Sequence, residues 1–256
     1  MTTNHNDDPA ISVIIPTYNE EKRIEKTLIS VRNQKCEIPY ETIVVDGQSL
    51  DNTVKISEQY AKTYISPKKG KVNQLNYVTP KTKGNLILFL DADTLISPDF
   101  LSYIHELFIK DDDLFACSAR FKYYDGIALN FSLGSKNFTL TNYFFQNSFV
   151  HTWYFFKTLY GYPELSGSNI VVRRKIYQKV GGFKEPPNSL GIDKVFSDSI
   201  LFLTKKMNKG KIKTLNFISV LTSGRHLTVE RSIKRLNQYN NQKEIYSNLA
   251  MKLHDI

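Results

Sequence analysis

The chain has 256 residues, of which 41% are hydrophobic and 23% are charged, and this ordinary globular composition excludes an intrinsically disordered protein. Its length suffices for one large α/β domain or two small ones. Lysine and arginine outnumber aspartate and glutamate by 34 to 25, and the resulting charge of +9 favours a phosphate-bearing or polyanionic partner without selecting one.

The cysteines and the N-terminus indicate the cellular compartment in which the protein is expected. Cys36 and Cys117 are too far apart for a metal or redox motif, and residues 1–10 contain no apolar stretch of the signal-peptide kind. No apolar run approaches the ~20 residues that a membrane-spanning helix needs. We therefore expect a cytoplasmic protein, soluble or attached to the inner face of the cell membrane.

The first 120 residues alternate strands and helices. Apolar runs predict strands at 11–15, 42–46 and 86–91. Helical spacing predicts a helix after each strand: one capped by Asn19, one ending near Tyr64, and one capped by Ser97 with Pro98 in first position. This pattern predicts an α/β fold with a mostly parallel sheet flanked by helices. Ligands of such sheets bind beyond the carboxyl ends of the strands.

The amino-acid composition changes after residue 120. Residues 121–165 are rich in Phe and Tyr, which predicts a helical subdomain packed on the sheet or, alternatively, an exposed aromatic surface for an acceptor or a bilayer. The later elements expected are a strand and helix ending at Gly181-Gly182, a helix at 197–208, a strand at 211–221 and a basic helix at 228–253. With neither repeat nor linker, we expect one domain.

Three of the expected strands end in polar clusters, at 16–21, 46–53 and 91–94. Asp91 and Asp93 are two residues apart, so in an extended segment both carboxylates face the same side. Two close carboxylates repel each other unless a cation neutralises them, and Mg²⁺ or Mn²⁺ does so with phosphate oxygens and water as further ligands. An Asp-x-Asp pair alone is more often a solvated turn, but the shared position at strand ends favours a site.

These motifs, in this order, resemble the family 2 glycosyltransferases of the GT-A fold over most of the chain. The matching segments are VIIPTYNEE, IVVDGQSLDNT, GKVNQLN, LFLDAD, GSNIVVRRKIYQKVGGFKE and SDSILF. The segment LTSGRHL is similar to the TSGRR ending of a small, soluble, single-domain branch. The resemblance implies one Rossmann-like GT-A domain over 1–256, with a nucleotide-binding half at about 9–120, an acceptor-binding half at about 121–227 and a basic C-terminal helix at about 228–256.

The resemblance also implies the residues of the site. The substrate-binding positions are Pro16, Thr17, Tyr18, Asn19, Glu20, Asp46, Gly47, Ser49, Lys71, Asp91, Ala92, Gly167, Asn169 and Arg225. Asp46 is expected to accept a hydrogen bond from the base, and Arg225 to clamp the diphosphate. Lys71 is equally well explained as a surface lysine. Asp93 is the expected metal ligand, with Asp91 beside it and His226 as a candidate third ligand.

The implied reaction is inverting transfer of one sugar from a UDP- or GDP-linked donor to an acceptor hydroxyl or a lipid phosphate, with Asp198 as general base. The synthase signature Gln-x-x-Arg-Trp is absent, which favours single transfers. Ser197 stands where the family has an acidic residue, so a catalytically silent nucleotide-sugar-binding protein is the alternative.

The basic residues are scattered rather than gathered in a stripe, and no nucleic-acid module is recognised, so we expect no nucleic-acid partner. The basic C-terminal helix and the aromatic segment predict peripheral membrane contact. The sequence leaves open the sugar, the acceptor and the oligomeric state.

Overall fold

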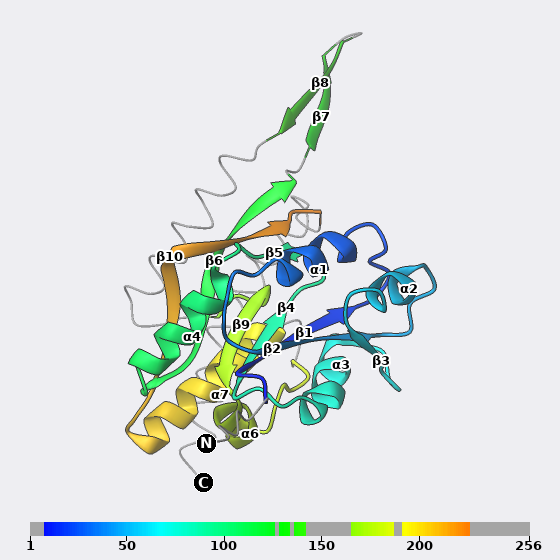
Figure 1. Ribbon diagram of the computed structural model, residues 1–256. Helices are drawn as coiled ribbons and strands as arrows, with labels where there is room; N and C mark the ends of the chain where they lie inside the picture. The colour runs from blue at the N-terminus through cyan, green and yellow to red at the C-terminus, as the bar shows by residue number, and fades with distance from the viewer. Residues whose placement is uncertain (1–7, 126–127, 134–135, 142–164, 187–190, 226–256) are drawn as a thin grey trace. The chain divides into compact units, whose positions relative to one another are not determined.

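The computed structural model describes residues 8–125, 128–133, 136–141, 165–186 and 191–225. These residues fall into two compact units, the first within 8–122, 165–186 and 191–222 and the second comprising 123–125, a hairpin and 223–225. Apart from residues 123–125 and 223, the first unit contains the main sheet, in the strand order β3-β2-β1-β4-β9-β6-β10-β5 (Figure 1). Its strands are β1 (Ile11–Thr17), β2 (Tyr40–Asp46), β3 (Lys62–Ile65), β4 (Leu86–Leu90), β5 (Thr94–Leu95), β6 (Leu114–Asp125), β9 (Asn169–Arg173) and β10 (Lys211–Ser223).

The sheet is mixed, and its parallel half holds the first polar clusters. Strands β1, β2, β3 and β4 pair in parallel, whereas β9 runs antiparallel to both β4 and β6, and β10 runs antiparallel to β5. The carboxyl ends of β1, β2 and β4 therefore lie at one edge. Because β6 is antiparallel to β9, which is itself antiparallel to β4, the part of β6 in the first unit runs toward that same edge.

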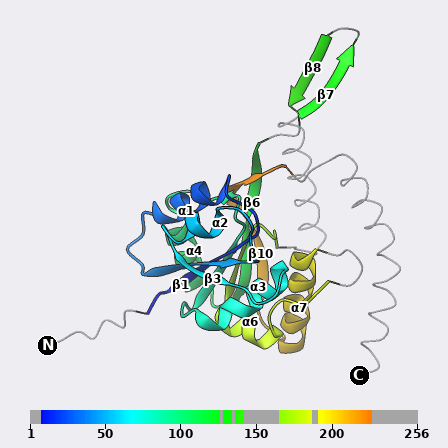
Figure 2. The ribbon, with the colours of Figure 1, turned by 90° about the vertical axis from the view of Figure 1, so that its right-hand side faces the viewer.

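Helices cover both faces of the sheet. They are α1 (Ile24–Arg32), α2 (Thr53–Ser57), α3 (Lys71–Val78), the 3₁₀ turn η1 (Thr79–Lys81), α4 (Phe100–Lys110), α6 (Arg174–Val180) and α7 (Ile192–Met207). Buried side chains of α1 and α4 pack in one apolar cluster, and those of α3, α6 and α7 in the other. Figure 2 shows these two sets of helices on opposite sides of the strands.

The α/β fold and most elements of the first half are confirmed. The run at 11–15 lies within β1, the run at 42–46 within β2, and Leu86–Leu90 is β4. Helix α6 ends at Val180 and is followed by Gly181, whose φ of +76° is the left-handed conformation that glycine adopts without steric cost. The late strand is β10. No helix in the described residues is both long enough and apolar enough to cross a membrane.

Several local predictions are wrong. Asn19 and Ser97 do not cap α1 and α4, which begin after Arg23 and Asp99. The second helix ends at Ser57 rather than near Tyr64, because residues 62–65, which include the strand-favouring Thr63, Tyr64 and Ile65, pair with β2 as strand β3. Helix α7 begins at Ile192, before the predicted start at residue 197.

The helical subdomain predicted at 121–165 is wrong where the structure describes it. Strand β6 runs on to Asp125, and β7 (Ala128–Leu133) and β8 (Lys136–Thr141) form an antiparallel hairpin in the second unit. In that unit Ser223 Oγ donates a hydrogen bond of 2.7 Å to the carboxylate of Asp125. The aromatic residues at 142–164, including Trp153, and the basic helix predicted at 228–253 lie outside the described residues.

Candidate functional site

The loops after β1 and β2 are bound to each other by hydrogen bonds between backbone and side chain. Asn19 donates its backbone N–H to Ser49 Oγ at 2.8 Å, and its own Oδ1 accepts from Leu50 N at 2.9 Å. Glu20 N donates to Thr53 Oγ1 at 2.7 Å, while the Glu20 carbonyl accepts from Ile24 N at the start of α1. Asn19 adopts a φ of +53°, a conformation that asparagine tolerates better than most residues. Asn19 thus orders this loop pair instead of capping α1.

Asp46 is buried at the end of β2 and organises the same loops. Its carboxylate accepts hydrogen bonds from Thr17 Oγ1 at 2.9 Å, from Ser49 N at 2.7 Å and from Ser49 Oγ at 2.5 Å. Three donors thus enclose a carboxylate that has no exposed surface, and the hydrogen bond from a nucleobase stays a prediction. Gly47 N donates to the Thr17 carbonyl at 2.8 Å, and this bond extends the pairing of β1 and β2 by one residue.

Other predicted residues take different places around these loops. Pro16 is buried within β1, opposite Val45 of β2. Tyr18 keeps 46% of its surface exposed, and the ammonium of Lys69 lies 5.3 Å from its ring centroid. An exposed aromatic face beside a cation suits the stacking of a flat, negatively charged ligand.

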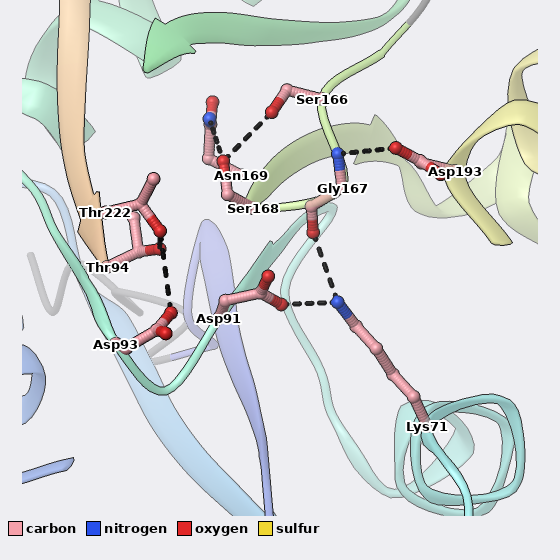
Figure 3. A network of polar contacts seen from close by, with 10 residues as sticks. All are labelled: Lys71, Asp91, Asp93, Thr94, Ser166, Gly167, Ser168, Asn169, Asp193 and Thr222. Atoms are coloured by element: carbon pink, nitrogen blue, oxygen red, sulfur yellow. Dashed lines mark hydrogen bonds and ion pairs between the residues drawn. The ribbon is translucent and has the colours of Figure 1, made fainter. Parts of the chain in front are cut away.

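Lys71, at the start of α3, joins the loop after β4 to the segment before β9. Its ammonium forms an ion pair with Asp91 and donates to the Gly167 carbonyl at 3.3 Å, as Figure 3 shows. Burial alone would lower the pKa of Lys71, but the Asp91 carboxylate, with smaller contributions from Asp193 and Asp93, outweighs burial and raises it. Lys71 is therefore a charged, partly exposed lysine held in an ion pair at this edge of the sheet, and its contact with a nucleotide stays a prediction.

Asp93 lies apart from this ion pair, at the junction of β5 and β10. Thr222 Oγ1 lies 3.5 Å from Asp93 Oδ1 and also accepts a bond of 2.9 Å from Thr94 Oγ1. The intervening Ala92 is buried, and its carbonyl accepts from Thr27 Oγ1 at 2.8 Å. The two aspartates thus have different partners: Asp91 pairs with a lysine, whereas Asp93 lies beside threonine hydroxyls.

The carboxylates present fit one mode of metal binding. No group of three or more His, Cys, Asp or Glu that could hold a metal occurs among the described residues. Mg²⁺ and Mn²⁺, however, are commonly held by one or two carboxylates together with substrate phosphates and water. Asp93 fits that mode, and Asp91 fits it less well because Lys71 already neutralises it.

The segment 165–169 crosses the same edge of the sheet. Asp91 N donates to the Ser168 carbonyl at 3.0 Å, which fixes the segment beside the end of β4. Asn169 is fully buried and exchanges bonds with both the N–H and the carbonyl of Ala119, at 2.6 and 3.2 Å. Of the two predicted residues here, Gly167 reaches the polar network and Asn169 supports it from the core.

Asp193, a residue not predicted from the sequence, completes this network. It lies in the first turn of α7, and its Oδ2 accepts from Gly167 N at 3.2 Å, as Figure 3 shows. Any side chain at Gly167 would meet this carboxylate, because a Cβ there would lie 3.1 Å from Asp193 Oδ2. Polar contacts therefore run without a break from Asp193 through Gly167 and Lys71 to Asp91.

Asp198, the predicted base, lies in the second turn of α7 and pairs with Lys194 through both carboxylate oxygens. It is five positions after Asp193, which turns its side chain about 140° away around the helix axis. The helix dipole favours a carboxylate in the first turn of a helix, and in α7 that carboxylate is Asp193 rather than Asp198. Its sequence signal was the spacing of Ile192, Phe196 and Ile200, which extends the helix back to residue 192.

Ser197 has a structural function. Its side chain is buried, accepts from Leu165 N at 3.0 Å and donates to the Asp193 carbonyl at 2.7 Å. An acidic residue here would bury a charge and lose the donated bond. Of the C-terminal candidates, Arg225 belongs to the second unit, where its N–H lies 3.4 Å from Ser223 Oγ, and His226 is outside the described residues.

Comparison with solved structures identifies the fold as that of the GT-A glycosyltransferases. TarS of S. aureus (residues 1–349) superposes with a TM-score of 0.59 at 23% identity, covering 83% of this chain and 60% of its own. The mannosyltransferase PcManGT of Pyrobaculum calidifontis gives 0.58 at 20% identity, covering 84% of this chain and 57% of its own.

The sequence model of Glycosyl transferase family 2 matches residues 12–181, more than half of the chain, and the protein therefore belongs to that family. Among curated relatives, the beta-monoglucosyldiacylglycerol synthase of Nostoc sp. is 28% identical over 200 residues, which are 73% of this chain and 41% of that protein. The chain thus spans less than half the length of the curated relatives that it matches.

Proposed function

We propose that the protein is an inverting, metal-dependent glycosyltransferase that moves one sugar from a nucleoside-diphosphate sugar to an acceptor hydroxyl or lipid phosphate. The observation that carries the proposal is the network from Asp91 through Lys71 and Gly167 to Asp193. This network joins the end of the parallel strands, where nucleotides bind in such sheets, to a carboxylate on a separate helix. Displacement with inversion needs the leaving group and the base on opposite sides of the sugar.

The donor is a UDP- or GDP-linked sugar in this proposal. TarS has been solved with UDP-GlcNAc and with UDP, and PcManGT with GDP-Man and Mn²⁺. In this chain the exposed Tyr18 ring offers a stacking surface, whereas Asp46 is fully buried and would have to be uncovered by a movement of the loop at Ser49 before it could accept a base N–H. Both uracil and guanine carry such an N–H, so these residues support the nucleotide class without choosing the base.

Each charged group has one function in the proposed reaction. Asp93 would hold the divalent ion, which when bound supplies Lewis-acid neutralisation of the diphosphate leaving group. The Lys71 ammonium, whose charge Asp91 balances, keeps the segment at Gly167 in place at the same edge. Asp193 takes the proton from an acceptor hydroxyl as the bond to the sugar forms.

Asp198 is the second candidate for the base, from its place in the family pattern. Its ion pair with Lys194 would have to open before it could accept a proton. Asp193 needs no such rearrangement, because its carboxylate already contacts the segment that lies against Asp91 and Lys71. We therefore propose Asp193 as the base and retain Asp198 as the sequence-based candidate.

The alternative of a silent nucleotide-sugar-binding protein rested on Ser197. Its buried position makes it a poor place for a catalytic carboxylate, so the serine is no longer an argument against activity. The curated relative named beta-monoglucosyldiacylglycerol synthase supports a lipid-linked acceptor. With such an acceptor the enzyme would work at the cytoplasmic face of the membrane, reached by peripheral contact.

A thermal-shift screen of nucleotide sugars, with and without Mn²⁺, tests the donor and the metal together. A ligand that binds only the folded protein stabilises it by RT ln(1 + [L]/Kd), so the proper donor raises Tm and Mn²⁺ increases the rise. Release of free nucleotide is then measured with the best donor and candidate acceptors. A rise in Tm without nucleotide release from any acceptor would favour the silent protein, and no rise with any donor contradicts the proposal.

A further inference from the structure

Arg120 lies at the same edge of the sheet as the site, yet neither the family pattern nor the network above includes it. Strand β6 pairs with β9 in the register Ala116↔Val172 and Ser118↔Ile170. If the register is continued, Arg120 falls opposite Ser168, whose carbonyl accepts from Asp91 N at 3.0 Å. Arg120 is therefore placed one strand beyond β9 at the edge where Asp91 follows β4.

The guanidinium lies on the face of the sheet that carries α3 and α7. Cys117 and Ala119 of β6 pack in the apolar cluster with α1 and α4, whereas Ala116 packs in the cluster with α3 and α7. Side chains alternate along a strand, so Arg120 shares the second face with Ala116 and Ser118. Ser118 Oγ accepts from Ser166 N at 2.8 Å, which brings the segment containing Gly167 against this end of β6.

Arg120 has a buried donor without a protein partner. Its Nε is the one buried side-chain nitrogen or oxygen, among the described residues, that has no hydrogen-bond partner. Buried polar atoms nearly always have a partner, and one without a partner costs stability, more so on a charged group. The unpartnered Nε is one N–H of a planar fork that matches the oxygens of a phosphate, so a phosphate that contacted the guanidinium would satisfy it.

We propose that Arg120 binds a phosphate group of the acceptor. The inference rests on the proposed function, because it takes Asp193 as the base and the base must face the acceptor rather than the leaving nucleotide. Arg120 lies on the face that bears α7, and the segment that contacts Ser118 is the one that contacts Asp193. The ligand is thus a phosphate-bearing acceptor, either a lipid phosphate or a soluble phosphate ester.

Isothermal titration of the full chain, saturated with UDP and Mn²⁺, tests the proposal with three probes. These are inorganic phosphate, glycerol 3-phosphate and octyl phosphate, with glycerol and octanol as uncharged controls. We expect at least one of the phosphate probes to bind. Arg120→Gln should raise the Kd of that probe tenfold or more, because the loss of one charge-assisted hydrogen bond lowers affinity by about tenfold. Tighter binding of octyl phosphate than of glycerol 3-phosphate indicates a lipid acceptor, and the reverse order a soluble one.

Lys122→Gln is the matched control. It removes one positive charge two residues further along the same strand, from an exposed side chain, and should leave phosphate affinity within twofold. An equal loss in both variants would mean general attraction to a basic surface and would overturn the proposal. Unchanged affinity in Arg120→Gln would overturn it too, as would a wild-type complex that binds UDP but none of the phosphates.

Nucleotide affinity separates this proposal from others. If Arg120→Gln lowers the affinity for UDP or GDP instead of the affinity for the acceptor probe, Arg120 binds the donor diphosphate and the acceptor assignment is wrong. If the wild type binds no nucleotide at all, the proposed function fails first. Arg120→Met is a second variant, for the case that Arg120→Gln does not fold. It keeps an apolar stem and removes the unpartnered donor, so it should retain the wild-type Tm. Octyl phosphate should no longer raise the Tm of this variant.

Discussion

The backbone N–H of Gly167 donates a hydrogen bond of 3.2 Å to Asp193 Oδ2, and this contact joins helix α7 to the edge of the sheet that carries Asp91. The same glycine accepts from Lys71 through its carbonyl, so one peptide segment connects a carboxylate and an ammonium. Because glycine has no Cβ, both groups can approach its backbone closely. The geometry of the proposed base therefore depends on a residue without a side chain.

Replacing Asp193 with Asn should lower kcat by about a hundredfold or more, the usual contribution of a positioned general base. The amide keeps the shape of the side chain, so the affinity for the nucleotide sugar should change little. Asp198→Asn, which breaks the ion pair with Lys194, should lower kcat by less than about tenfold. Steady-state release of nucleotide measures both, and the opposite ranking would return the catalytic function to Asp198.

Gly167→Ala should slow the reaction without weakening the donor complex. Its new Cβ would lie 3.1 Å from Asp193 Oδ2, so the carboxylate would have to move by a few tenths of an ångström. Misplacement of a reacting group on that scale lowers kcat by about tenfold in our expectation. Gly181→Ala is the control: its φ of +76° should cost about 1 kcal/mol of stability, with kcat unchanged.

Asp93→Ala should abolish the part of the thermal shift that depends on Mn²⁺. A donor at 100 times its Kd stabilises the native state by about 2.7 kcal/mol, and the variant should give the same smaller shift with and without the ion. Asp99→Ala removes an exposed carboxylate shortly after Asp93 in the chain, and it should keep the full metal-dependent shift. Retention of that shift in Asp93→Ala would contradict the metal assignment.

How far the sequence predicted the site depended on the type of element. The strands β1, β2 and β4 were predictable because each is a continuous apolar run that both faces of the sheet bury, and the polar residues that follow had to meet at one edge. The ion pair of Lys71 with Asp91 was not predictable. The pair joins Lys71 at the start of α3 to Asp91, which lies 20 residues later in the chain. A contact between residues that far apart is not encoded in local sequence patterns.

Asp193 was missed for a local reason. The predicted helix began at Ser197, a good capping residue, but in the structure Ser197 is buried inside α7 and bonds to the Asp193 carbonyl one turn earlier. Serine serves in both situations, as a cap and as a buried partner of the preceding turn. Capping preference and apolar spacing disagreed here, and the packing of Phe196 and Ile200 decided the helix start.

The stability of the Lys71 ion pair should depend on pH in a defined direction. The pKa of Lys71 is raised in the folded state, so its contribution is complete below the unfolded value of about 10.4 and is lost as pH rises through the folded value. The difference in unfolding free energy between wild type and Lys71→Met, about 1–3 kcal/mol at neutral pH, should therefore shrink in strongly alkaline buffer. Lys110→Met breaks an exposed pair with Glu106 and should cost less than about 1 kcal/mol.

Ser197→Asp, which restores an acidic residue where the family usually has one, should destabilise the protein rather than activate it. The side chain would be buried, would face Leu165 N, and would no longer donate to the Asp193 carbonyl. A buried charge with one donor should cost roughly 3 kcal/mol or more, and the displaced first turn of α7 should also lower kcat. Ser199→Asp, at a half-buried position two residues later, should cost less than about 1 kcal/mol. Urea unfolding together with nucleotide release measures both effects, and a stable, faster Ser197→Asp enzyme would show that α7 presents position 197, not Asp193, to the acceptor.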